Sequence, residues 1–160
     1  MKLSYQWPLP IQPKPIAIIG SGGIVNDAHL PAYRKADFKV LGVFDIDPEQ
    51  SAKVAETWNL KAFESLERLI SSAQANNAVF DLALPPSAVS KVLERVPDHA
   101  TVLIQKPMGS DLEEAKEIKE ICERKKLTAA VNFQLRFSPM MLALKDAMSK
   151  KVLHKILDLE

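Results

Sequence analysis

The chain has 160 residues, of which 47% are apolar and 26% are charged, and its formal net charge is +1. This length suits one substantial domain, and the apolar share is sufficient for a buried core, which excludes a chain that stays disordered for lack of one. Lys and Arg are spread along the sequence and form no basic stripe, so nucleic acid is not expected as a partner.

No apolar run approaches the roughly 20 residues that a membrane-spanning helix needs, and the first residues hold no segment like the core of a signal peptide. We therefore expect a soluble, cytoplasmic protein with no membrane partner. The single cysteine, Cys122, has no second cysteine to pair with. It shares one face of a predicted helix with Leu112, Ala115 and Ile118, so we expect it in the core of a protein kept in a reducing compartment.

Residues 1–14 contain Pro8, Pro10 and Pro13 and are expected to form an extended arm. Beyond the arm, short apolar runs alternate with amphipathic segments. Strands are predicted at 16–20, 38–44, 61–63, 78–84, 101–105 and 127–133. Helices are predicted at 23–36, 48–58, 65–75, 87–96 and 112–126. This alternation is typical of βαβ units and predicts an α/β domain over 15–133, with a doubly wound parallel sheet and helices on both faces.

Local signals support two of the helix starts. Asp47 precedes Pro48, and Ser110-Asp111 precedes a first turn rich in glutamate, which are arrangements typical of helix caps.

After Phe133 the pattern changes. Residues 136–151 predict a further helix, and residues 152–160 predict a strand whose alternation reaches the last residue. A terminal strand needs a sheet to join, and these residues do not supply one. We therefore expect the chain to be the front part of a larger protein, with 134–160 opening an incomplete second α+β domain.

A glycine turn follows the first predicted strand. Gly20 and Gly22 have the spacing of G-x-G, and Gly23 and Ile24 begin the next helix. Without a side chain at Gly22 a pyrophosphate can approach the backbone, where the free N–H groups of the first helical turn face its oxygens. The third glycine position of the G-x-G-x-x-G pattern is occupied by Val25. The alternative is a tight strand-to-helix connection that holds no ligand.

Asp45 stands at the carboxyl end of the second predicted strand, directly after Phe44 and 25 positions after Gly20. An acidic side chain at an offset of roughly 20 residues accepts hydrogen bonds from the adenosine ribose. It also repels a 2′-phosphate, so NAD is favoured over NADP. The alternative for Asp45 is a turn residue.

Two other functions fit a glycine turn of this kind. S-adenosylmethionine-dependent methyltransferases use a similar turn, but the strand before it lacks the acidic residue that is usual in that class. A non-catalytic module would bind a dinucleotide, or nothing, and recruit a partner through the arm or the terminal strand.

Four stretches occur in a recognisable order: AHLPAY, LALPPS, IQKPMG and NFQLRFSP. Together they resemble the glucose-fructose oxidoreductase/inositol dehydrogenase/MocA (Gfo/Idh/MocA) family, from Ile16 to about Lys155. The resemblance implies a Rossmann-type dinucleotide-binding domain followed by a substrate domain in a longer protein, which forms a homo-oligomer. It also implies an NAD(P)-dependent oxidoreductase that moves hydride between a nicotinamide and a hydroxyl or carbonyl carbon of a small sugar-like or polyol-like substrate.

The family's Glu-Lys-Pro motif corresponds to Gln105-Lys106-Pro107, and Pro107 invites a cis bond after Lys106. By this resemblance Lys106 reaches the nicotinamide ribose and the reacting hydroxyl, where an ammonium favours alkoxide character and helps to relay the proton. Gln105 replaces the family's acid and removes a negative charge beside Lys106. Leu84 and Pro85 match the loop that passes beside the cofactor.

Arg136 belongs to the family's Arg-Phe-x-Pro pattern, and two alternatives stay open for it: contact with cofactor or substrate, or an ion pair that anchors a domain junction. In members of the family a histidine often follows the loop that contains Leu84 and Pro85, and in this sequence that position is Val89. His29 is expected to pack or cap near the glycine turn and not to catalyse. None of the three histidines has a carboxylate or thiol at metal-ligand spacing, so no metal site is predicted.

A further acid/base group of the family comes from the second domain and has no match in this sequence. We therefore expect the 160 residues alone to bind dinucleotide with little or no turnover.

Overall fold

The structure is a computed structural model that describes residues 2–153. These residues form two compact units. The larger unit is Ile11–Asn132, and the smaller unit combines residues 2–10 with residues 133–153. The larger unit carries the sheet and most of the predicted site residues.

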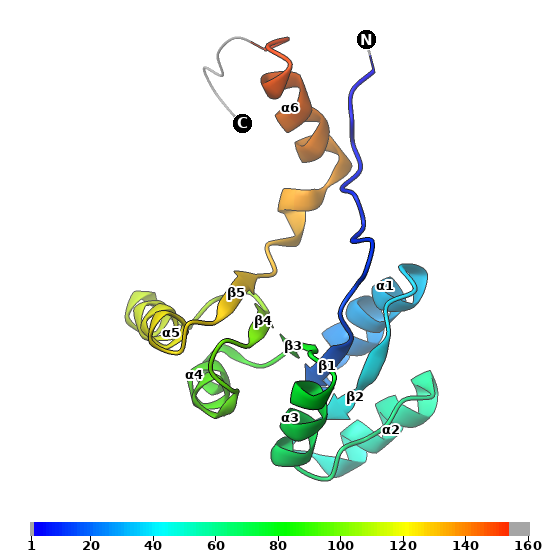
Figure 1. The fold of residues 1–160 in the computed structure, drawn as a ribbon, viewed down its shortest axis with the longest axis vertical. Helices are drawn as coiled ribbons and strands as arrows, with labels where there is room; N and C mark the ends of the chain where they lie inside the picture. The colour runs from blue at the N-terminus through cyan, green and yellow to red at the C-terminus, as the bar shows by residue number, and fades with distance from the viewer. Residues whose placement is uncertain (1, 154–160) are drawn as a thin grey trace. The chain divides into compact units, whose positions relative to one another are not determined.

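A five-stranded parallel sheet forms the centre of the larger unit (Figure 1). Its spatial order is β2-β1-β3-β4-β5, with β1 (Ile16–Ile19), β2 (Val40–Phe44), β3 (Val79–Leu82), β4 (Thr101–Ile104) and β5 (Thr128–Val131). Ala62 adds an isolated parallel bridge to Val43 in β2. With that bridge counted as a strand position, the order becomes 3-2-1-4-5-6, the arrangement of Rossmann folds.

Helices cover both faces of this sheet. They are α1 (Leu30–Lys35), α2 (Pro48–Trp58), α3 (Leu66–Ala75), α4 (Pro86–Arg95) and α5 (Leu112–Arg124). Ala17 and Ile19 of β1 belong to one buried cluster with residues of α3, α4 and α5. Ile16 and Ile18 belong to a second cluster with residues of α1 and α2. Because alternate residues of a strand point to opposite faces, β1 is buried on both sides, which confirms the predicted doubly wound sheet.

The segment predicted as one helix, 23–36, contains a π turn, η1 (Val25–His29), before α1. In this turn the N–H of Leu30 donates to the carbonyl of Val25. Pro31 accounts for the change, because proline has no N–H to donate and its ring displaces the carbonyl four residues earlier. The prediction of a regular helix was wrong at this point.

Two predicted strands also differ from the structure. The segment 61–63 forms no strand, only the single bridge at Ala62, because it is too short to continue a ladder. The strand predicted at 127–133 ends at Val131. The other strands and helices predicted for the larger unit are present, with ends that differ by a few residues.

Both predicted helix starts are confirmed. The Asp47 carboxylate accepts hydrogen bonds from the N–H groups of Glu49 and Gln50 at the start of α2. The Asp111 carboxylate accepts one from the N–H of Glu114 at the start of α5. Each cap satisfies N–H groups that have no partner within the helix.

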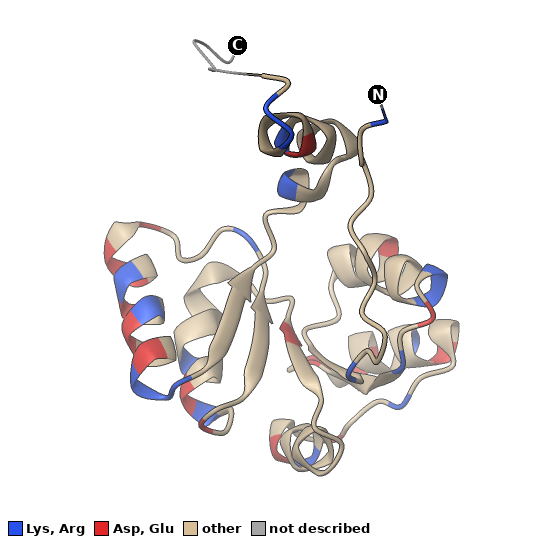
Figure 2. Cartoon of the chain, turned by 45° about the horizontal axis from the view of Figure 1, so that its top comes forward, with Lys and Arg blue, Asp and Glu red and all other residues tan. Residues whose placement is uncertain are grey.

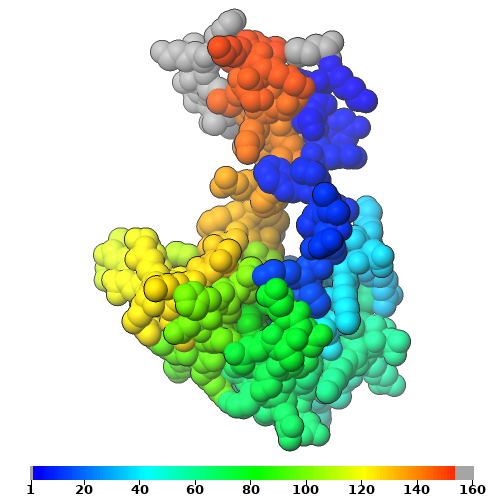
Figure 3. Space-filling model, in the orientation of Figure 1, coloured from blue at the N-terminus to red at the C-terminus, as the bar shows by residue number. Residues whose placement is uncertain are grey.

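The smaller unit packs residues of the N-terminal arm against α6 (Pro139–Ser149), as Figure 3 shows in dark blue and orange. The rings of Trp7 and Phe137 meet edge to face with their centroids 5.5 Å apart. The N–H of Ser4 donates to the Asp146 carboxylate at 2.7 Å. The described part of the arm contains no helix or strand, as its prolines predict.

The helix predicted at 136–151 is a 3₁₀ turn, η2 (Gln134–Phe137), followed by α6. The prediction of one continuous helix was wrong because Pro139 starts a new helix, with Ser138 as its cap. The strand predicted at 152–160 falls largely on residues 154–160, which lie outside the described residues. Val152 and Leu153 are not in a strand.

Charges of both signs lie on the helices. Along α5, acidic and basic residues alternate (Figure 2), and Lys116–Glu113 and Lys119–Glu123 form exposed ion pairs. Within residues 2–153, no helix combines the length and the apolar character that crossing a bilayer requires.

Candidate dinucleotide-binding site

Gly20 directly follows β1, in a conformation that only glycine adopts readily. Its φ is +98°, and an added Cβ would lie 2.3 Å from the carbonyl oxygen of Ala83. Its N–H donates to the carbonyl of Phe44 at 2.8 Å. Gly20 is therefore required by the fold, because it lets the chain turn directly against the segment that follows β3.

Replacing Gly20 by alanine is expected to lower the free energy of unfolding by about 2 kcal/mol, because the residue would be strained and its Cβ would overlap a backbone atom. Urea denaturation of the 160-residue chain measures this change. An unfolding free energy equal to that of the wild type would contradict the assigned role of Gly20.

Gly22 differs from Gly20 because nothing inside the protein requires a glycine there. It is exposed, its φ is outside the left-handed region, and an added Cβ would meet no protein atom within 4 Å. The space in front of Gly22 is open, as close approach of a pyrophosphate requires. Among the described residues, no hydrogen bond uses the N–H groups of Gly22, Gly23 or Ile24.

Asp45 is tied to the glycine turn. Its Oδ2 accepts hydrogen bonds from the N–H of Ser21 at 2.6 Å and from the Ser21 hydroxyl at 2.8 Å. Its Oδ1 accepts one from the N–H of Asp47 at 3.0 Å. Asp45 thus acts as a turn residue, one of the two alternatives. A carboxylate offers about four acceptor positions, so it still has room to accept a hydrogen bond from a ligand.

A cavity of about 320 Å³ brings five of the predicted site residues together: Gly20, Gly22, Asp45, Leu84 and Pro85. The rest of its wall is apolar except for Arg95, which forms an ion pair with Glu67. An apolar wall with a carboxylate at its edge suits a flat heterocyclic ring joined to a sugar.

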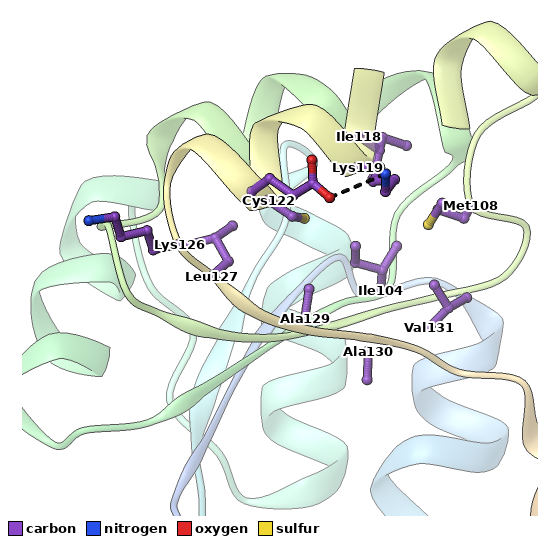
Figure 4. Close-up of a pocket in the computed structure, with 11 residues that line it drawn as sticks. Ile104, Met108, Ile118, Lys119, Cys122, Lys126, Leu127, Ala129, Ala130 and Val131 are labelled. Atoms are coloured by element: carbon purple, nitrogen blue, oxygen red, sulfur yellow. Dashed lines mark ion pairs between the residues drawn. The ribbon is translucent and has the colours of Figure 1, made fainter. Parts of the chain in front are cut away.

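A larger hollow of about 420 Å³ lies between α5 and β5 (Figure 4). Ile104, Cys122 and Ala129 are among its walls, and it contains none of the predicted site residues. Cys122, predicted as a core residue, is only half-buried here, although it packs against the core. Burial raises the pKa of its thiol, which therefore stays protonated. The charged groups at its wall are Lys119 and Glu123, which pair with each other on α5, and Lys126. Because none of the predicted site residues lines this hollow, we place the candidate site at the glycine turn.

Gln105 and Lys106 follow β4. Gln105 is buried, whereas the Lys106 side chain is exposed. The Lys106–Pro107 bond is cis, as the resemblance implied. The N–H of Lys106 donates to Gln105 Oε1 at 2.9 Å.

His29 is buried between Gln105 and an aspartate that the sequence interpretation missed, Asp81. Its Nε2 lies 3.0 Å from Gln105 Nε2, and its Nδ1 lies 2.7 Å from Asp81 Oδ2. Tyr33 donates to the same Asp81 oxygen at 2.8 Å. The signal available in the sequence was an aspartate in the middle of the apolar strand AVFDLAL, because a buried charge requires partners.

Arg136 lies in η2 of the smaller unit, and its side chain is exposed. No ion pair with another described residue includes it, and both alternatives for its role stay open. Within residues 2–153, no group of three or more His, Cys, Asp or Glu side chains is placed to hold a metal ion.

The strand order, the glycine turn and the carboxylate at the end of β2 define a Rossmann-type dinucleotide-binding fold. Residues 14–133 match the model of the GFO_IDH_MocA family, described as "Oxidoreductase family, NAD-binding Rossmann fold". The chain belongs to the Gfo/Idh/MocA family.

Two of the similar proteins are dehydrogenases. Glucose-6-phosphate 3-dehydrogenase of Bacillus subtilis is 30% identical over 150 residues, which are 92% of this chain and 41% of that protein. The solved UDP-N-acetylglucosamine 3-dehydrogenase GnnA of Acidithiobacillus ferrooxidans has a TM-score of 0.70 at 27% identity and covers 86% of this chain. This chain covers 44% of that structure. The chain therefore spans about two fifths of the length of these relatives.

Proposed function

We propose that this chain is the NAD-binding part of an oxidoreductase that acts on a hydroxyl or carbonyl carbon of a sugar-like small molecule. The observation that carries the proposal is the open backbone at Gly22, beside a cavity that Asp45 also lines. The named relatives support the substrate class, because both are dehydrogenases of sugars that carry phosphate or a nucleotide. We also propose a cytoplasmic location and, as the family resemblance implies, a homo-oligomeric full-length protein.

Three features would hold the cofactor. The free N–H groups of Gly22, Gly23 and Ile24 suit a diphosphate, because they lie at the N-terminal end of a helical segment. The remaining acceptor position of Asp45 suits a ribose hydroxyl. Leu84 and the other apolar lining residues suit the adenine ring. When bound, the nicotinamide supplies the hydride chemistry.

Lys106 is the proposed catalytic residue of this chain. Its exposed ammonium would lie beside the reacting oxygen of the substrate, where a positive charge stabilises alkoxide character. Gln105 beside it is neutral and holds the Lys106 backbone through one hydrogen bond. Pro85 completes the proposed cofactor contacts of the larger unit. For Arg136 the two alternatives remain contact with cofactor or substrate, or an ion pair that anchors a domain junction.

Calorimetric titration of the chain with NAD, NADP and S-adenosylmethionine tests the proposal. Heat of binding is expected with NAD. Tight binding of S-adenosylmethionine alone would favour a methyltransferase, and no heat with any of the three would favour a module that does not bind a dinucleotide.

The preference for NAD is expected to depend on the charge of Asp45. Asp45→Asn should reduce the ratio of NAD to NADP affinity by about tenfold, because a like-charge contact with a 2′-phosphate is removed. Asp47→Asn is the matched control: it removes one charge two residues away, and asparagine still caps α2. Equal effects of the two variants would show that Asp45 does not contact the ribose.

A further inference from the structure

Four side chains form a hydrogen-bonded network that ends at the backbone of Lys106, and all of them except the half-buried Tyr33 are buried. In order, these are Tyr33, Asp81, His29 and Gln105. The exposed fractions of Asp81, His29 and Gln105 are 1%, 6% and 8%. This hydrogen-bonded network links η1, which begins just after the glycine turn, to the loop that carries Lys106.

The direction of each hydrogen bond in the network follows from the backbone N–H of Lys106, because this group can neither rotate nor lose its proton. The backbone N–H of Lys106 can only donate, so the atom that faces it at 2.9 Å is the amide oxygen of Gln105. The amide nitrogen of Gln105 therefore faces His29 Nε2, at 3.0 Å. An amide NH₂ group only donates, so His29 Nε2 must carry no proton.

The proton of the neutral His29 ring is consequently on Nδ1, which faces Asp81 Oδ2 at 2.7 Å. Asp81 accepts there as a carboxylate. The same oxygen receives the Tyr33 hydroxyl at 2.8 Å. Burial, together with the charge of Asp81, raises the pKa of Tyr33, so its hydroxyl stays protonated and donates.

We infer that Asp81 and His29 are positioning residues: they fix the orientation of the Gln105 amide and thereby hold the backbone of Lys106. The inference rests on the proposed function only for the role of Lys106.

A carboxylate at position 105, as in the Glu-Lys-Pro motif, could not donate to His29 Nε2. In this protein the carboxylate that contacts the imidazole is that of Asp81, on the Nδ1 side. The amide of Gln105 is the hydrogen-bond donor on the Nε2 side. Asp81 thus supplies a negative charge to the same network, two side chains beyond Gln105.

The protonation state of His29 provides a test that needs neither cofactor nor turnover. In the ¹⁵N-labelled 160-residue chain at neutral pH, the ring signals of His29 should show a protonated Nδ1 and an unprotonated Nε2. Variants His99→Asn and His154→Asn assign the signal by removing the other histidines. A His29 that is cationic, or protonated on Nε2, would overturn the inference even if NAD binds.

Gln105→Glu changes the chemistry at one end of the network. It should make both ring nitrogens of His29 protonated at neutral pH, because the imidazole would then lie between two carboxylates. A His29 ring that stays neutral in this variant would also contradict the assignment.

Asp81→Leu tests the remote effect on Lys106. Without the acceptor for Nδ1–H, the Gln105 amide is no longer fixed, and hydrogen exchange of the Lys106 amide should become about tenfold faster. Tyr33→Phe is the matched control, because it removes one hydrogen bond from Asp81 but keeps the link through His29, and it should leave this exchange rate unchanged. An unchanged rate in Asp81→Leu would refute the positioning role. If that variant does not fold, the wild-type and Gln105→Glu spectra still decide the assignment.

If the chain has the predicted protonation but binds no NAD, the proposed function fails while the network stands.

Discussion

Gly22→Val is expected to weaken NAD binding by at least about 100-fold, which corresponds to roughly 2.7 kcal/mol. The added side chain would occupy the open space in front of the backbone, where the diphosphate must approach to reach the N–H groups of the helical turn. The free energy of unfolding should change by less than about 0.5 kcal/mol, since the new Cβ meets no protein atom and the position is exposed. Calorimetry with NAD and urea denaturation measure the two quantities.

Gly20→Ala supplies the contrast, because Gly20 is only two residues away but is required by the fold. It should lose stability, whereas Gly22→Val should lose binding. Wild-type NAD affinity in Gly22→Val would remove the glycine turn from the proposed site. A loss of stability in that variant comparable with that of Gly20→Ala would mean that Gly22 also has a structural role.

Much of the fold was predictable because its signals are local. Apolar runs separated by amphipathic segments predict β1 to β5 and the helices between them, and Asp47 and Asp111 mark helix starts by short-range hydrogen bonds. The π turn was missed because it results from one proline inside a pattern that is otherwise helical. The bridge at Ala62 was overestimated as a strand because three residues carry too little periodicity to decide.

The candidate site was predictable to the extent that it follows from topology. Gly20, Asp45 and Leu84 follow different strands, and the carboxyl ends of neighbouring parallel strands meet at one edge of the sheet. The contacts of Asp81 were not predictable in this way. His29 and Asp81 are 52 positions apart, and His29 and Gln105 are 76 positions apart. Their meeting depends on strand register and on the exact path of η1, which the pattern of residue types does not specify.

Lys106→Ala is expected to lower turnover by about 10²–10⁴-fold in a protein that joins this chain to a substrate domain. The proposed cause is the loss of the ammonium that stabilises the alkoxide and helps to relay its proton. NAD affinity should change by less than about threefold, because an exposed charge contributes little to binding. Steady-state kinetics and calorimetry on the same preparation measure both effects.

Lys116→Ala is the matched control, since it removes an exposed lysine whose described partner is Glu113 on the same helix. Equal losses of turnover and NAD affinity in Lys106→Ala would make Lys106 a binding group, and unchanged turnover would remove its catalytic role. The substitution is specific because Gln105 holds position 106 through the backbone N–H, which alanine retains. The change in turnover therefore reports the ammonium itself and not a displacement of the loop.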